Sequence, residues 1–201
     1  GLVGEDGPTH SGNYDIAFLR CIPNIILMSP SDENETRALL CSAFHYSGPA
    51  AVRYPRGSGP NAKVNLDLKP IENGKANLIK KGDPKVIFLN FGALLHEAKL
   101  VADELNLTLI DMRFIKPLDE EILRTYLKSA DLFISLEDGS IAGGAGSAVQ
   151  EFCSKENIYI KSKLFGIPDN FVEHASREEM IEECGLTSKQ ILAELETMME
   201  R

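Results

Sequence analysis

The stretch Val86-Ile87-Phe88-Leu89 decides the fold, because it is a continuous apolar run with the length of a buried parallel strand. A helical pattern of apolar residues follows from about Leu94 to Leu105, and then comes a second strand-like run, Thr108-Leu109-Ile110-Asp111-Met112. Strand, helix and strand joined by short connections predict a parallel sheet with helices packed on it. The sequence therefore predicts an α/β fold.

The same alternation extends in both directions. Toward the C-terminus, the expected elements are a helix at 119–127, a strand at 132–136, a helix at 146–155, a strand at 158–164 and two closing helices that begin at Ser176 and Thr187. Toward the N-terminus, they are a helix at 15–20, a strand at 25–28, a helix from Asp32 to about Tyr46 and a strand at 50–54. Asp32 and Glu35 have the spacing of a capping box.

The composition changes between the two sets of elements. Residues 57–84 are rich in Gly, Pro, Asn and Lys, with one weakly extended segment at 74–80, which is typical of a linker. We therefore expect two α/β/α units: one at 1–57, a linker at 58–84, and a second unit at 85–201. A piece as short as the first unit buries little surface by itself. We therefore expect it to pack against the second unit, another segment of the protein or a second copy of the chain.

The charge and the cysteines exclude several classes of protein. The net charge of -9 and the lack of a dense basic run argue against nucleic acid or an anionic membrane as a partner. No apolar run approaches the roughly 20 residues of a membrane span, and no signal-peptide pattern opens the chain. The four cysteines (Cys21, Cys41, Cys153 and Cys184) form no Cys-x-x-Cys pair and have no neighbouring histidine. They favour reduced thiols in the cytoplasm over a zinc site.

The loop Gly4-Glu5-Asp6-Gly7-Pro8-Thr9-His10-Ser11-Gly12 is the main candidate for chemistry. Its glycines and proline indicate constrained backbone angles, and it places the Asp6 carboxylate four positions from the His10 imidazole. Histidine is suited to proton transfer near neutral pH, and a carboxylate can orient it. The alternative is a surface turn with incidental polar residues. Arg56 follows the second strand of the first unit, at the edge where open α/β sheets bind ligands.

Several blocks in this order resemble the 1-deoxy-D-xylulose-5-phosphate synthase family. They are Gly7-Pro8-Thr9-His10, Leu19-Arg20-Cys21-Ile22-Pro23-Asn24, Pro30-Ser31-Asp32-Glu33-Asn34-Glu35, Val52-Arg53-Tyr54-Pro55-Arg56-Gly57, Asp111-Met112-Arg113-Phe114, Lys116-Pro117-Leu118-Asp119 and Gly143-Gly144-Ala145-Gly146-Ser147. The resemblance covers nearly the whole chain. It implies the latter part of a transketolase-type pyrimidine-binding domain followed by a complete transketolase C-terminal domain.

The resemblance also implies an activity. The family condenses pyruvate with D-glyceraldehyde 3-phosphate and releases CO₂, as a homodimer that uses thiamine diphosphate and Mg²⁺. Its enzymes are roughly three times as long, and the groups that bind cofactor and metal lie upstream of Gly1. The chain, which begins without methionine, is expected to be a fragment that is inactive alone and binds neither thiamine diphosphate nor Mg²⁺. No cofactor-binding or metal-binding residue is assigned.

By the same resemblance, three residues carry the chemistry. His10 hydrogen-bonds or transfers a proton to substrate oxygens, Asp6 contacts the acceptor or orients neighbouring groups, and Arg56 binds the acceptor's phosphate. A guanidinium suits this last role because its planar fork donates two parallel hydrogen bonds.

Other polar residues are interpreted as structural. Arg20 and Arg53 are expected to form ion pairs or packing contacts, and His45, His96 and His174 have no matching motif. The Gly143-Gly144-Ala145-Gly146-Ser147 turn resembles a phosphate cradle, but we expect it to serve close packing between helix and sheet, or an interface.

Two other functions stay open. One is a different thiamine enzyme, such as transketolase or the beta subunit of a 2-oxo acid dehydrogenase, since fold alone does not separate these enzymes. The other is a non-catalytic assembly or small-molecule-binding module built on residues 85–201.

Overall fold

The computed structural model describes residues 1–199 and contains two sheets. The larger sheet has five strands in the order β3-β5-β4-β7-β8. Their bounds are Asn77–Lys80 (β3), Asp83–Phe91 (β4), Leu107–Asp111 (β5), Leu132–Ser140 (β7) and Lys161–Ile167 (β8). The edge strand β3 is antiparallel to β5, and the other neighbours are parallel. The predicted α/β fold is confirmed.

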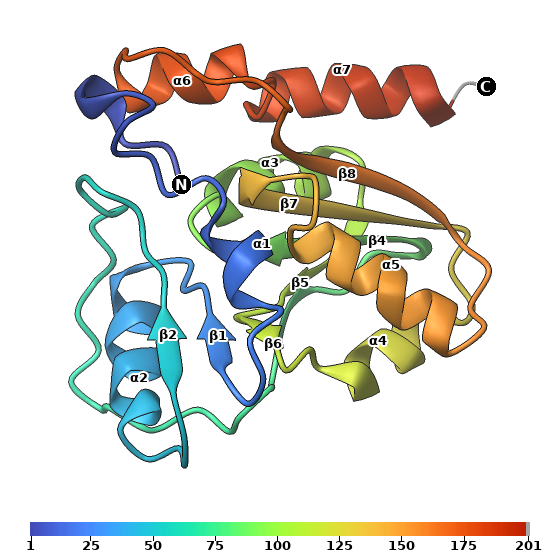
Figure 1. Ribbon diagram of the computed structural model, residues 1–201. Helices are drawn as coiled ribbons and strands as arrows, with labels where there is room; N and C mark the ends of the chain where they lie inside the picture. The colour runs from blue at the N-terminus through green and yellow to red at the C-terminus, as the bar shows by residue number, and fades with distance from the viewer. Residues whose placement is uncertain (200–201) are drawn as a thin grey trace.

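Helices cover both faces of this sheet (Figure 1). On one side, α3 (Leu95–Glu104) and α7 (Ser188–Met199) pack on a core that contains Phe88 and Ile134. On the other side lie α4 (Glu120–Leu127) and α5 (Ala145–Lys155). Adjacent residues of one strand point to opposite faces, so the apolar runs are buried on both sides.

The smaller sheet has the order β2-β1-β6, with bounds Ala50–Val52 (β2), Ile26–Met28 (β1) and Phe114–Lys116 (β6). Helix α2 (Glu33–Ala43) packs on one face, where Leu39 contacts the core around Met28 and Phe114. The other face, with Leu27, joins the core beneath the larger sheet. The short elements η1 (Gly4–Asp6) and α1 (Asp15–Leu19) precede this sheet.

Strand β6 was not predicted. It comes from the second half of the chain, yet it pairs antiparallel with β1 in the first half. Strand β6 lies between Arg113, whose φ is +57°, and Pro117. Three residues are too short a sequence run to indicate a strand. The two halves therefore share one sheet.

Three other expectations need correction. Strand β7 continues past Leu136 to Ser140, and β8 begins at Lys161 instead of Ile158. The Asp32 carboxylate accepts the Glu35 N–H (2.8 Å), but the capping box is incomplete. The Glu35 carboxylate instead accepts two hydrogen bonds from Arg113, at 2.7 and 2.6 Å. A bidentate ion pair is the stronger partner for this carboxylate.

The first part of the expected linker at 58–84 lies along α2, whereas its end forms β3 and the start of β4 in the larger sheet. The Glu33 carboxylate accepts the Asn61 and Ala62 N–H groups (2.9 and 3.2 Å), and the Ser42 hydroxyl accepts the Ile71 N–H (2.7 Å). Because these bonds go to the linker backbone, they hold the segment in an extended path without requiring a particular side chain. The described residues include no helix long and apolar enough to cross a membrane.

Candidate substrate-binding site

Asp6 and Arg56 lie together although they are 50 positions apart in the sequence. Asp6 ends η1, and Arg56 follows β2 in a bend; their side chains form an ion pair. The Arg56 side chain is 62% exposed and that of Asp6 33% exposed. A largely exposed guanidinium is available to an anionic ligand, which would replace Asp6 as its partner.

His10 shares the opening loop with Asp6. Its backbone N–H donates to the Gly7 carbonyl (3.2 Å), and its imidazole Nδ1 lies 3.0 Å from the Thr9 hydroxyl. Within residues 1–199 no hydrogen bond or ion pair joins His10 to Asp6 or Arg56. The loop that carries Asp6 therefore also presents an exposed imidazole.

Gly7 gives the opening loop its path. Its φ is +64°, a left-handed value that glycine adopts without strain. A Cβ at Gly7 would lie 3.0 Å from the Cβ of His174. The loop thus packs against the segment that precedes α6 (Arg177–Glu183).

Arg53 has a structural role. Its guanidinium donates to the Asp15 carboxylate (2.8 Å), the Asp138 carbonyl (2.7 Å) and the Gly12 carbonyl (3.4 Å). Its side chain is only 10% exposed. Arg20 likewise forms an ion pair, with Glu151 of α5.

The glycine-rich turn holds the protein's own carboxylate. The Glu137 carboxylate accepts the N–H groups of Ala145 and Gly146, at 2.8 and 2.9 Å, at the N-terminus of α5. A Cβ at Gly144 would lie 2.4 Å from a Glu137 oxygen. The turn therefore serves close packing, as expected, and its N–H groups are not available to a phosphate.

Burial raises the pKa values of two carboxyl groups, those of Glu137 and Asp111. It raises the pKa of Glu137 to about 7, although the two backbone N–H groups favour the ionised form. It raises the pKa of Asp111 to about 6, against hydrogen bonds from Ser31 (2.8 Å) and Asn90 (3.0 Å). Neither carboxyl contacts Asp6, His10 or Arg56.

Sequence reasoning missed Glu137 and Asp138, which lie at the carboxyl end of β7 and are 0% and 2% exposed. Their only signal is their place directly after the apolar run 132–136. Acidic residues at such a place are usually exposed, so the pattern favoured the end of the strand.

Two family models match the chain: the transketolase pyrimidine-binding domain over residues 1–61 and the transketolase C-terminal domain over residues 74–191. Curated relatives include the 1-deoxy-D-xylulose-5-phosphate synthase of Stutzerimonas stutzeri, 54% identical over 186 residues, which are 92% of this chain and 29% of that protein. The synthase of Pseudomonas fluorescens (strain Pf0-1) is 52% identical over all 201 residues and 32% of its own length. The chain thus spans about a third of these relatives.

Solved structures agree with the fold. A split-gene transketolase, described as an inactive beta4 tetramer, superposes with a TM-score of 0.82 at 27% identity, over 94% of this chain and 62% of the other. A transketolase from Campylobacter jejuni superposes with a TM-score of 0.72 at 22% identity, over 96% of this chain and 29% of the other. The second likeness shows the fold alone.

Proposed function

Because the chain belongs to the transketolase family, we propose that it forms part of a 1-deoxy-D-xylulose-5-phosphate synthase, a thiamine diphosphate-dependent transferase. This enzyme condenses pyruvate with D-glyceraldehyde 3-phosphate and releases CO₂. Identity of about half over nearly the whole chain to relatives with this name supports the proposal. The structural observation that carries it is the ion pair between the exposed Arg56 and Asp6, which lies on the same loop as His10.

In this proposal Arg56 binds the phosphate of the acceptor. The guanidinium is already held at the loop by Asp6, and a dianionic phosphate is a stronger partner than one carboxylate. Phosphate binding then frees Asp6 to accept a hydrogen bond from an acceptor hydroxyl. His10, on the same loop, donates a hydrogen bond or a proton to a substrate oxygen.

We assign no residue of this chain to the cofactor or its metal ion. Within residues 1–199, no three His, Cys, Asp or Glu side chains are arranged to hold a metal ion. The glycine-rich turn is filled by Glu137. Thiamine diphosphate and Mg²⁺ therefore belong, in this proposal, to other segments of the full-length enzyme, and the roles of Asp6, His10 and Arg56 concern the substrates alone.

The proposal includes the domain limits, an assembly and a location. We divide the chain into a pyrimidine-binding part at 1–57, a linker at 58–84 and a C-terminal domain at 85–201. We propose a homodimer, supported by the exposed apolar side chains Tyr14, Phe18 and Ile22, which lie before, in and after α1. Four free cysteines support a reducing cytoplasmic location.

An assay of the full-length protein tests the function. With thiamine diphosphate and Mg²⁺, we expect pyruvate and D-glyceraldehyde 3-phosphate to give 1-deoxy-D-xylulose 5-phosphate and one CO₂ per product. Transfer of a two-carbon unit from a ketose phosphate without CO₂ release would instead indicate a transketolase. Acyl transfer from pyruvate to a lipoyl group would indicate a 2-oxo acid dehydrogenase, and no turnover of any of these would favour a binding module.

A further inference from the structure

The buried carboxylate of Asp138 joins segments that surround the proposed site. Its Oδ1 accepts the Leu2 N–H at 3.1 Å, and its Oδ2 accepts a hydrogen bond from Arg177 of α6 at 2.9 Å. Asp138 belongs to β7 of the larger sheet and is 2% exposed. One side chain of the C-terminal part therefore fixes the start of the opening loop to α6.

The backbone of Asp138 holds the other side of the site. Its carbonyl accepts a hydrogen bond from Arg53 at 2.7 Å, and Arg53 also contacts Asp15 and Gly12. Arg53 follows β2 directly and is three residues from Arg56. The segment that carries Arg56 is thus tied to the same residue as the loop that carries Asp6 and His10.

Close packing leaves this region little freedom. A Cβ at Gly1 would lie 2.3 Å from the Asp138 carboxyl carbon, so there is no room for a side chain at this position. Leu2 is fully buried in a small core with Ile167, Val172 and Met180. The opening loop therefore rests on the C-terminal part through both apolar and polar contacts.

We propose that Asp138 is a positioning residue of the site: from the C-terminal sheet, it fixes the Asp6–His10 loop relative to Arg56. This inference rests on the proposed function for its effect on turnover, but its structural part is independent of any substrate. Asp138 itself touches no substrate. It acts through Leu2 and Arg177 on the loop side and through Arg53 on the Arg56 side.

A carboxylate is required here because the Arg177 guanidinium donates directly to it, whereas Arg53 donates to the Asp138 carbonyl and is paired with Asp15. Removing one partner of a buried ion pair leaves the other charge without compensation. Asp138→Asn keeps an oxygen that can accept from the Leu2 N–H. Its amide NH₂ group then faces Arg177 and cannot accept a hydrogen bond from it. Asp138→Ala removes both contacts of the side chain and leaves the carbonyl bond to Arg53.

Kinetics of the full-length protein provide one test. A displacement of about 1 Å in a site can lower the rate roughly 100-fold. We expect Asp138→Ala to lower kcat/KM for D-glyceraldehyde 3-phosphate about 10- to 100-fold, and Asp138→Asn and Arg177→Met to lower it less. Arg177→Lys should lose less activity than Arg177→Met, because lysine keeps the positive charge. Values within twofold of the unmodified protein for all variants would overturn the proposal.

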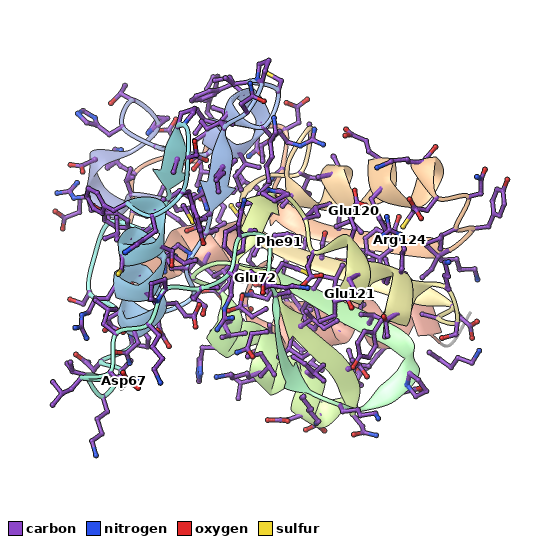
Figure 2. All side chains as sticks on the ribbon, turned by 90° about the horizontal axis from the view of Figure 1, so that it is seen from below. Asp67, Glu72, Phe91, Glu120, Glu121 and Arg124 are labelled. Atoms are coloured by element: carbon purple, nitrogen blue, oxygen red, sulfur yellow. The ribbon has the colours of Figure 1, made fainter. Side chains whose placement is uncertain are left out.

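The matched control is Glu156→Ala, which breaks a carboxylate–arginine pair in the same half of the chain, away from the site. Glu156 accepts a hydrogen bond from Arg124 at 2.8 Å, and Arg124 lies beside Glu120 on α4 (Figure 2). We expect it to lower the melting temperature and leave kcat/KM unchanged. An equal loss of kcat/KM in Glu156→Ala would mean that Asp138 contributes only general stability.

Hydrogen exchange on the chain itself separates this inference from the proposed function. In Asp138→Asn, amides of residues 2–12 should exchange faster, whereas those of residues 50–56, which are held through the Asp138 carbonyl, and those of α4 and α5 should not. Glu156→Ala should show the reverse pattern. Unchanged exchange in residues 2–12 would overturn the positioning role even if the enzyme proves to be a synthase. A full-length protein without synthase activity but with the expected exchange pattern would overturn the proposed function alone.

Discussion

Glu137 shows how one buried residue can determine the pH dependence of stability. Its carboxylate is 0% exposed and is held by two backbone N–H groups at the start of α5. Its pKa is raised from 4.5 to about 7, mainly by burial. The folded state therefore binds a proton more tightly than the unfolded state between these two values. By linkage, the contribution of Glu137 to stability is complete below pH 4.5 and is lost as the pH rises through 7.

We predict that the free energy of unfolding falls by about 3 kcal/mol between pH 4.5 and 7.5 through Glu137, with a smaller fall in the same direction from Asp111. Glu137→Gln, which cannot ionise, should lose most of this pH dependence. Urea unfolding of both proteins at pH 5 and pH 7.5 measures the difference. Equal pH dependence in both would show that Glu137 stays ionised in the folded protein.

At the same scale, the site residues differ in how well the sequence predicts them. Asp6, His10 and Arg56 lie in loop motifs with few structural reasons for their residue types, so pattern and resemblance could propose them as candidates. Asp138 follows an apolar run, and its importance comes from partners as distant in sequence as Leu2 and Arg53. Such long-range contacts have no periodicity that a single sequence can show.

Helix α5 illustrates how an element is fixed by small residues. Gly146 lies in its first turn, where a Cβ would lie 2.4 Å from the Ser135 hydroxyl and 2.9 Å from a Leu164 methyl. The helix can approach the sheet this closely only without a side chain at this position. The Gly143–Ser147 turn is therefore a packing feature of α5 and β7.

We predict that Gly146→Ala lowers the free energy of unfolding by about 1 to 3 kcal/mol through overpacking. The Ser135 hydroxyl has no hydrogen-bond partner among the described residues, so Ser135→Ala alone should cost little. In the double variant, loss of the hydroxyl should relieve much of the cost of Gly146→Ala. A double-mutant cycle by urea unfolding measures this coupling, and additive effects would contradict the packing account.

At the element scale, the sequence predicted the helices and strands that are long and have a clear apolar pattern. The long elements of the larger sheet were located from apolar runs and helical spacing. Strand β6 was missed because three residues between Arg113 and Pro117 carry no pattern, and its pairing with β1 is decided by tertiary contacts. The path of the linker along α2 was missed because side chains of α2 bind its backbone.

At the scale of the whole molecule, the first part is completed by the second. Strand β6 extends the smaller sheet, and Asp138 ties the opening loop and the Arg56 segment to the larger one. Residues from both halves thus build the surroundings of a site whose proposed substrate contacts all come from the first. This arrangement explains how a short N-terminal part can hold the Asp6 loop and the Arg56 segment in place.

The central claim is that Asp6, His10 and Arg56 form the binding site for a phosphorylated acceptor. Arg56→Ala in the full-length protein removes the guanidinium, and a charge-assisted hydrogen bond contributes roughly 1.5 to 3 kcal/mol. His10→Ala should behave differently and lower kcat as well, since the imidazole acts on a substrate oxygen. Arg53→Lys is a poor control because Arg53 holds the Arg56 segment in place. Arg37→Ala is a better one, because it removes an exposed guanidinium that donates to the linker carbonyl of Asn65.

The most direct measurement is the steady-state kinetics of Arg56→Ala with each substrate varied in turn. We predict that kcat/KM for D-glyceraldehyde 3-phosphate falls roughly 10- to 150-fold, mainly through KM, while KM for pyruvate changes little because pyruvate carries no phosphate. Arg56→Lys should recover part of the loss, and Arg37→Ala should match the unmodified protein. An equal effect on both substrates, or unchanged kinetics with a lower melting temperature, would contradict the assignment of this site.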